Sequence, residues 1–184
     1  MDELTTLFHS ARAGDAEAVG RIYQVLYDDL RRIAHAKLRN AEGVALLDTT
    51  GLVHESYLRL QKLAELNVSD RPHFLAYAAR AMRSIVVDFA RQQGAGRRGG
   101  DHLQVTLGTT AAGSVATADS DEILRVHEAL EKLGRIDSRL VQVVEMRYFA
   151  GLDEAEIADA LGVSVRTVAR DWEKARLFLF EALK

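Results

Sequence analysis

The sequence has no cysteine and only one proline, Pro72, among its 184 residues. Without cysteine the chain can form neither a disulfide nor a cysteine-ligated zinc site, which fits a reducing cytoplasm. No apolar run approaches the roughly 20 residues that cross a bilayer. The first residues also lack the basic and then apolar pattern of a signal peptide. We therefore expect a cytoplasmic protein without a membrane partner.

Residues that would carry catalysis or hold a cofactor are also scarce. The histidines are scattered, and His54 and Glu55 are adjacent on an expected helix, so their side chains point in different directions. A zinc site needs three or four convergent ligands. The glycine-rich stretch at 94–100 does not follow a strand, as a phosphate-binding loop would. We predict no enzymatic activity, no cofactor and no metal.

The apolar residues, 48% of the chain, are enough to bury a core, and they recur at helical spacings of three and four. This periodicity predicts an all-α protein. Asp15 is a plausible N-cap of the second helix. We expect one helix to end at Gly94 and another at Gly134, because glycine disfavours helix. The expected helices span residues 4–11, 16–38, 52–63, 72–93, 123–133, 140–148, 154–161 and 165–183.

The chain divides into two small helical domains joined by a flexible linker. Residues 99–119 are rich in Gly, Ala, Ser and Thr and have no bulky apolar period, which is typical of a linker. The expected domains are therefore 1–98, with four helices, and 120–184. A shorter loop is expected at 40–47.

The net charge of −3 does not by itself indicate a nucleic-acid binder, but the basic residues are clustered. One cluster spans residues 71–98, a stretch that contains six arginines and only one acidic residue, Asp88. A second follows Val165 at helical spacing. Two basic surfaces on an acidic background suggest two contacts with DNA.

The segment 152–179 has the pattern of a helix-turn-helix. Gly162 suits the tight turn, and Ser164 can cap the second helix. That helix would enter the major groove and read bases with side chains on its outer face. The alternative is an ordinary helical hairpin whose charged face is only solvated. The predicted DNA-binding residues are Ser164, Arg166, Thr167, Arg170 and Lys174.

Three segments in order resemble the bacterial extracytoplasmic-function (ECF) sigma factors. LVHESYLRLQKL at 52–63 looks like the polymerase-binding helix of that family. The segment 71–100, RPHFLAYAARAMRSIVVDFARQQGAGRRGG, looks like its promoter-melting helix. The sequence of this segment is similar to that of a subgroup associated with Ser/Thr protein kinases. YFAGLDEAEIADALGVSVRTVARDWEKAR at 148–176 looks like its −35-reading domain.

The resemblance implies an alternative sigma factor that directs core RNA polymerase to promoter DNA. The first domain would be a four-helix sigma domain 2, which binds the polymerase clamp helices and the −10 element. The second would be a helix-turn-helix sigma domain 4, which binds the polymerase flap and the −35 element. We expect the free protein to be a monomer. The residues expected at the −10 element are Arg71, Arg80, Arg83 and Arg91, and those expected at the polymerase are Asp48, Leu52, Val53, Glu55, Tyr57 and Arg59.

One departure from the family pattern is informative. Members carry an acidic cluster before the polymerase-binding helix, whereas this chain has Asp48-Thr49-Thr50-Gly51. Phosphorylation of Thr50, or otherwise Thr49, by a Ser/Thr kinase would add about −1.5 to −2 charges at a helix start. The alternative is that one of these threonines is a plain N-cap.

Two other functions fit a helix-turn-helix. A free-standing regulator would carry an N-terminal sensor or dimerisation domain and bind a palindromic operator as a dimer. A helical adaptor would not bind DNA. The arginine-rich stretch 71–98 favours the sigma factor, since a sensor domain needs a ligand pocket instead.

Overall fold

The structure is a computed structural model that describes residues 3–39, 48–61, 70–99 and 117–184, and every regular element in these ranges is a helix. The all-α prediction is confirmed. The elements are α1 (Glu3–Arg12), α2 (Ala16–Val25), α3 (Tyr27–Arg39), α4 (Thr49–Gln61), α5 (Arg71–Gly99), α6 (Thr117–Ile136), α7 (Ser138–Val144), the π-helix η1 (Glu145–Phe149), α8 (Glu154–Leu161) and α9 (Val165–Ala182).

The helix expected at 16–38 is divided at Leu26 into α2 and α3, so the described residues before 100 form five helices where four were expected. Asp15 caps α2 as predicted, accepting hydrogen bonds from the N–H groups of Glu17 and Ala18. Leu26 has a non-helical backbone, with φ −99° and ψ 13°. Its N–H still reaches the carbonyl of Ile22 at 2.9 Å. The apolar stripe therefore continues across the bend, which is why periodicity alone missed it.

Two expected helix ends are wrong. The α5 backbone continues beyond Gly94 to Gly99, and α6 continues beyond Gly134 to Ile136. Glycine costs a helix about 1 kcal/mol relative to alanine, so it disfavours helix without forbidding it. A Cβ on Gly134 would lie 3.5 Å from Cγ2 of Val141, an ordinary van der Waals contact, so the position does not require glycine. The loop expected at 40–47 and residues 100–116 of the expected linker lie outside the described residues.

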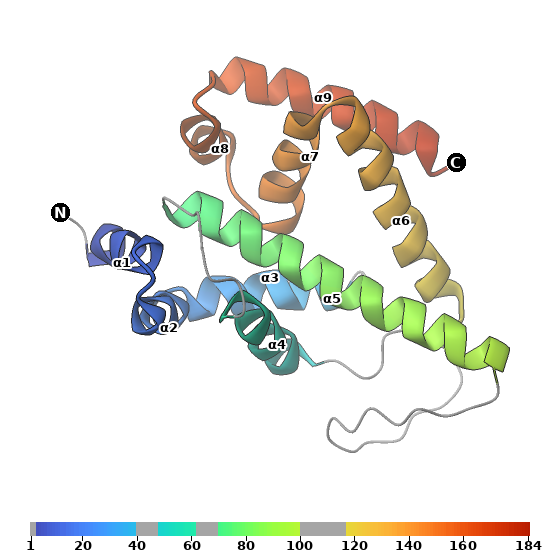
Figure 1. Cartoon of the computed structure of the whole chain (residues 1–184). Helices are drawn as coiled ribbons and strands as arrows, with labels where there is room; N and C mark the ends of the chain where they lie inside the picture. The colour runs from blue at the N-terminus through green and yellow to red at the C-terminus, as the bar shows by residue number, and fades with distance from the viewer. Residues whose placement is uncertain (1–2, 40–47, 62–69, 100–116) are drawn as a thin grey trace.

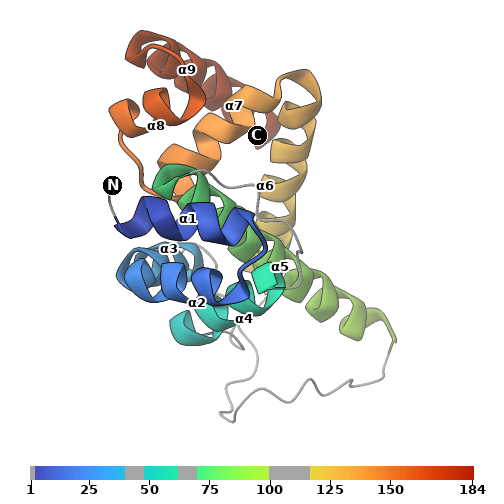
Figure 2. The ribbon, with the colours of Figure 1, turned by 60° about the vertical axis from the view of Figure 1, so that its left-hand side comes forward.

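The long helix α5 is the centre of the arrangement. In Figures 1 and 2, α1 to α4 lie on one side of α5, and α6 to α9 lie on the other. One apolar cluster joins the two sides: it contains Phe74 and Met82 of α5 together with Ile157 of α8 and Val168 of α9. A smaller cluster around Leu133 lies within the C-terminal half. The two halves are thus packed against each other through α5.

None of the helices in the described ranges is long and apolar enough to cross a membrane.

Candidate nucleic-acid and polymerase interfaces

The first helix of the predicted helix-turn-helix, α8, begins at a capping box. The Asp153 side chain accepts hydrogen bonds from the N–H groups of Ala155 at 2.9 Å and Glu156 at 2.8 Å. Glu156 returns the bond, because its Oε2 accepts from the Asp153 N–H at 3.0 Å. Three backbone N–H groups at the start of α8 are thereby satisfied, which anchors the beginning of the helix.

The turn between α8 and α9 forms as the sequence predicts. Gly162 ends α8 with φ +63°, a conformation that side chains other than glycine rarely adopt. The next N–H, from Val163, bonds back to the Ala158 carbonyl at 3.0 Å. Ser164 then caps α9, accepting from the Thr167 N–H at 3.2 Å.

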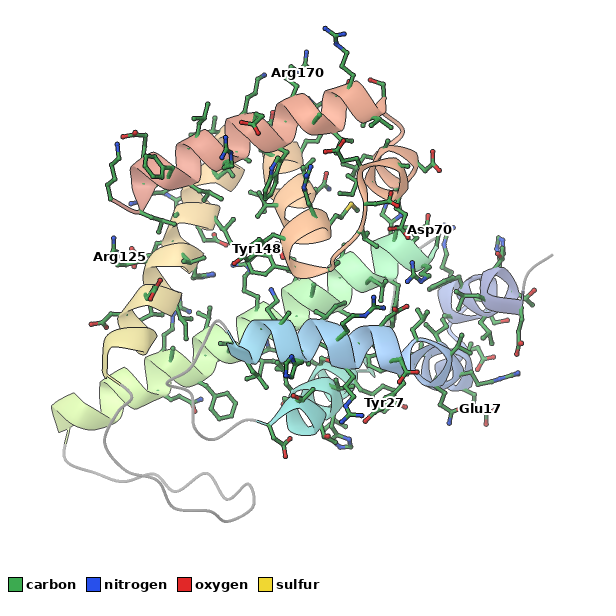
Figure 3. All side chains as sticks on the ribbon, turned by 180° about the vertical axis from the view of Figure 1, so that it is seen from behind. Glu17, Tyr27, Asp70, Arg125, Tyr148 and Arg170 are labelled. Atoms are coloured by element: carbon green, nitrogen blue, oxygen red, sulfur yellow. The ribbon has the colours of Figure 1, made fainter. Side chains whose placement is uncertain are left out.

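The outer face of α9 presents three cations. Arg166, Arg170 and Lys174 are exposed and follow one another at four-residue spacing, whereas Val168 is buried beneath them. Figure 3 shows Arg170 on the outer side of α9. Thr167 differs, because it is only partly exposed and its hydroxyl lies 2.9 Å from the Ser164 hydroxyl. Thr167 and Ser164 therefore serve the helix start in this structure.

An ion pair with one buried partner, the Asp171 carboxylate, holds α9 in place. Asp171 is 1% exposed, and its Oδ2 accepts from Nε of Arg139, at the start of α7, at 2.7 Å. Asp171 points inward from the helix whose outer face carries the cations. The orientation of that face is therefore set by a contact between residues 32 positions apart in sequence.

The four predicted arginines of α5 separate into two pairs. Arg80 and Arg91 are exposed, and they share one face because they lie about three helical turns apart. Arg71 instead bridges Asp29 of α3 at 2.8 Å and Glu156 of α8 at 3.0 Å. Arg83 is largely buried, with its side chain 11% exposed. The sequence suggested one basic surface on this helix. In this structure two of its arginines are exposed to solvent and two are paired with carboxylates.

Arg83 lies in a cluster of charged groups between the halves. Its Nε donates to Oε1 of Glu145 in η1 at 2.9 Å, and its Nη1 lies 2.7 Å from Nδ1 of His127 in α6. Burial lowers the pKa of His127, and the Arg83 charge lowers it further. On the other side, Nζ of Lys37 lies 3.2 Å from the centre of the Phe149 ring. Burial holds the pKa of Lys37 well below its usual range.

The start of α4 is capped by Asp48 and not by either threonine. Asp48 Oδ1 accepts from the Gly51 N–H at 2.6 Å, so the simple N-cap role for Thr49 or Thr50 is wrong. Thr50 is exposed in the first helical turn, and Thr49 is partly buried. Thr50 also lines a groove of about 400 Å³ between α2 and α4, with Tyr27, His54 and Tyr57 among the residues around it.

The other residues predicted on α4 take different positions. Leu52 and Val53 are 0% and 4% exposed, so the structure gives them a packing role in place of the predicted surface role. They were expected at the polymerase because the segment 52–63 resembles the polymerase-binding helix of the family, and that resemblance covers a helix as a whole without telling its core face from its binding face. Glu55 and Tyr57 are partly exposed. Arg59 reaches Asp88 of α5 at 2.8 Å, which ties the two helices together.

The ECF sigma factor family model matches the chain over residues 1–184. The chain belongs to the ECF sigma factor family. A solved structure of CnrH in complex with the cytosolic domain of CnrY is similar at 22% identity, over 99% of this chain and 97% of that chain, with a TM-score of 0.43. No curated protein sequence matches.

Membership in the ECF family gives this chain an alternative sigma factor's part in transcription initiation, with RNA polymerase and promoter DNA as partners. The match includes the N-terminal half, where a free-standing regulator would have an unrelated sensor or dimerisation domain. Both the helix-turn-helix and the arginine-bearing α5 are therefore parts of one sigma factor.

Sequence reasoning missed several charged residues of this sigma factor. Lys37, Glu145 and Asp171 are buried and each has an atom without a hydrogen-bond partner in the described part of the chain. The available signal was their position: each charge interrupts an apolar helical stripe. Among the described residues, no three His, Asp or Glu side chains converge in a way that could hold a metal ion.

Proposed function

We propose that this ECF sigma factor is switched on by phosphorylation of Thr50, which completes the surface that binds core RNA polymerase. A Ser/Thr kinase would transfer the γ-phosphoryl group of ATP to the Thr50 hydroxyl and release ADP. The observation that carries the proposal is the cap of α4. Because Asp48 occupies the capping position, the hydroxyl of Thr50 is not needed to begin the helix.

The position of Thr50 also suits a charge switch. Its side chain is exposed, so a kinase can reach it, whereas Thr49 is partly buried. A phosphate there would lie at the N-terminus of α4, where the helix dipole favours an anion. It would also lie beside the groove between α2 and α4, whose lining includes the exposed Tyr27 and the partly exposed Tyr57. The added phosphate would therefore lie next to apolar side chains that a binding partner can also contact.

The size of the effect follows from charge-assisted hydrogen bonds. A phosphate can form one to three of them with an arginine or lysine cluster. At about 1.5–3 kcal/mol for each hydrogen bond to a charged group, one or two of them change affinity by roughly tenfold to several hundredfold. Asp48 contributes less binding energy than a phosphate would, because its carboxylate is already hydrogen-bonded to the Gly51 N–H.

For DNA, we propose that Arg166, Arg170 and Lys174 read the −35 element from the outer face of α9. Their support is exposure on one helix face, whose orientation Asp171 and Arg139 hold. At the −10 element, Arg80 and Arg91 are the exposed members of the predicted set. Arg71 and Arg83 are proposed contacts too, but they first have to leave their carboxylate partners.

The test of the switch is the affinity of full-length protein for core polymerase. It compares the unmodified protein, the kinase-treated protein, and the Thr50→Ala and Thr50→Glu variants. Phosphorylation should tighten binding by at least tenfold, and Thr50→Glu should do so partially because a carboxylate carries less charge. Kinase treatment of Thr50→Ala should have no effect, whereas the matched control Thr49→Ala should respond fully. Equally tight binding by the unmodified and phosphorylated proteins would refute the switch.

A further inference from the structure

The C-terminal half covers part of α5 through the π-helix η1. The wide turn of η1 closes with a hydrogen bond from the Ala150 N–H to the Glu145 carbonyl at 2.9 Å. It directs Glu145 to Arg83 and places the Phe149 ring against Lys37. In Figure 3, Tyr148 of η1 lies between α7 and α5.

The contact is made by charges that only this packing buries. The side chains of Arg83 and Glu145 are 11% and 6% exposed, and their closest atoms are 2.8 Å apart. They come from opposite halves of the chain, 62 residues apart. At the far end of the interface, Arg71 and Glu156 form a second, more exposed pair at 3.0 Å. Figure 3 shows Asp70, the residue before α5, close to α8 in the same region.

We infer that the C-terminal half is an intramolecular competitor for the arginines of α5, latched by the pairs Arg83–Glu145 and Arg71–Glu156. In this closed form, the guanidinium groups that would otherwise bind DNA phosphates are paired with carboxylates. The inference rests on the proposed DNA-binding function of α5 for its consequence, but the latch itself does not depend on that function.

The competition follows from the geometry of arginine. A guanidinium group binds a carboxylate or a phosphate with the same donors, so one arginine cannot fully engage both. A ligand of the open form binds with an apparent affinity reduced by the fraction of molecules that are open. Weakening the latch should therefore strengthen DNA binding without any new contact. Arg80 and Arg91, which are exposed already, should be unaffected.

The latch can be measured directly because the chain contains no cysteine. Cysteines introduced at the exposed residues Ala13 and Ala182 would carry donor and acceptor dyes, one in each half. The test variant is Glu145→Gln with Glu156→Gln. Glutamine at 156 retains the capping box of α8. The matched control is Glu3→Gln with Glu17→Gln, which makes the same charge change on exposed residues of α1 and α2. Circular dichroism would check that all variants are helical.

We expect energy transfer to fall in the latch variant and to stay unchanged in the control. The second measurement is anisotropy with a labelled single-stranded DNA of mixed sequence, since phosphate contacts do not depend on sequence. The latch variant should bind it at least tenfold more tightly than the control. Its log–log salt dependence should steepen by roughly 0.7, the contribution of Arg83. Arg71 keeps its bridge to Asp29 of α3 when Glu156 is replaced. Glu156→Gln alone should give a smaller shift in the same direction.

The contrary results separate the latch from the proposed function. Unchanged energy transfer in the latch variant overturns the latch. Opening without tighter DNA binding overturns the competition. In that case Arg80→Ala with Arg91→Ala decides the function: lost affinity keeps α5 as a DNA-binding helix, and unchanged affinity removes that proposal too.

Discussion

Replacing Lys37 by methionine should stabilise the protein. The side chain is 7% exposed, its Nζ has no hydrogen-bond partner in the described part of the chain, and burial depresses its pKa. When the pKa of a group is lower in the folded protein than in the unfolded chain, the protein becomes less stable as the pH falls below the pKa of the unfolded chain, here 10.5. At neutral pH, therefore, Lys37 opposes folding. Methionine has a similar length and no polar group to bury.

Two effects compete in this substitution. If the amine is charged, methionine loses a cation–π contact with Phe149 of about 0.5–2 kcal/mol. It also removes the desolvation cost of a buried ion, which is about several kcal/mol. If the amine is neutral, there is no cation–π contact to lose, and the removed cost of an unpaired polar group is about 1–3 kcal/mol. In both cases, methionine retains a sulfur–aromatic contact worth about 0.3–1.5 kcal/mol.

We therefore expect a gain of about 1–2 kcal/mol, or a Tm higher by about 2–8 °C for a protein of this size. Calorimetry and urea unfolding at pH 7 would measure it. The matched control is Lys132→Met, an exposed lysine on α6 whose replacement should change stability by less than about 0.5 kcal/mol. A loss of stability for Lys37→Met would refute the reasoning. It would mean that Lys37 is charged and paired in solution, with Glu145, whose charge favours the charged amine, as the candidate partner.

Three further predictions concern the recognition helix and the interface. Arg139→Ala should destabilise by about 1.5–3 kcal/mol because it removes the charged hydrogen-bond partner of the buried Asp171 carboxylate and leaves only Arg170, 3.7 Å away, whereas Asp171→Asn should cost less since Arg139 is 41% exposed; unfolding curves of equal midpoint would contradict this. Arg170→Ala should cost about 1–3 kcal/mol of discrimination at one base position, measured by transcription from a library of promoter variants, and an unchanged preference would exclude base reading by Arg170. The lowered pKa of His127 makes the closed form most stable above pH 6.5, and the closed form loses stability as the pH falls from there through the lowered pKa. Energy transfer between the halves should therefore drop between pH 7.5 and about pH 5.5. The His127→Gln variant should not show this drop. The charged groups around His127 are Lys37, Arg83, Asp88, Arg91, Glu122 and Glu131.

The local features of this protein could be predicted from the sequence, because each depends on neighbouring residues. Helical periodicity identified the all-α class, and Gly162 and Ser164 identified the turn and cap between α8 and α9. These signals act within about one helical turn, where backbone geometry and a single side chain decide the outcome. The same reasoning failed at Gly94 and Gly134, because a weak local preference gave way to continued helix.

The partners of the charged residues were decided only by the tertiary structure. An arginine on a helix has the same local pattern whether water, DNA or a carboxylate faces it, so the sequence could not separate Arg80 from Arg83. The carboxylate of Glu145 comes from a distant segment, and only the packing of η1 on α5 brings it within 2.8 Å. Thr50 is a similar case: the sequence offered Thr49 or Thr50 as the cap of α4, and the folded backbone directs the Gly51 N–H to Asp48 instead. Propensity acts along the chain, whereas burial and charge pairing depend on which segments the fold brings together.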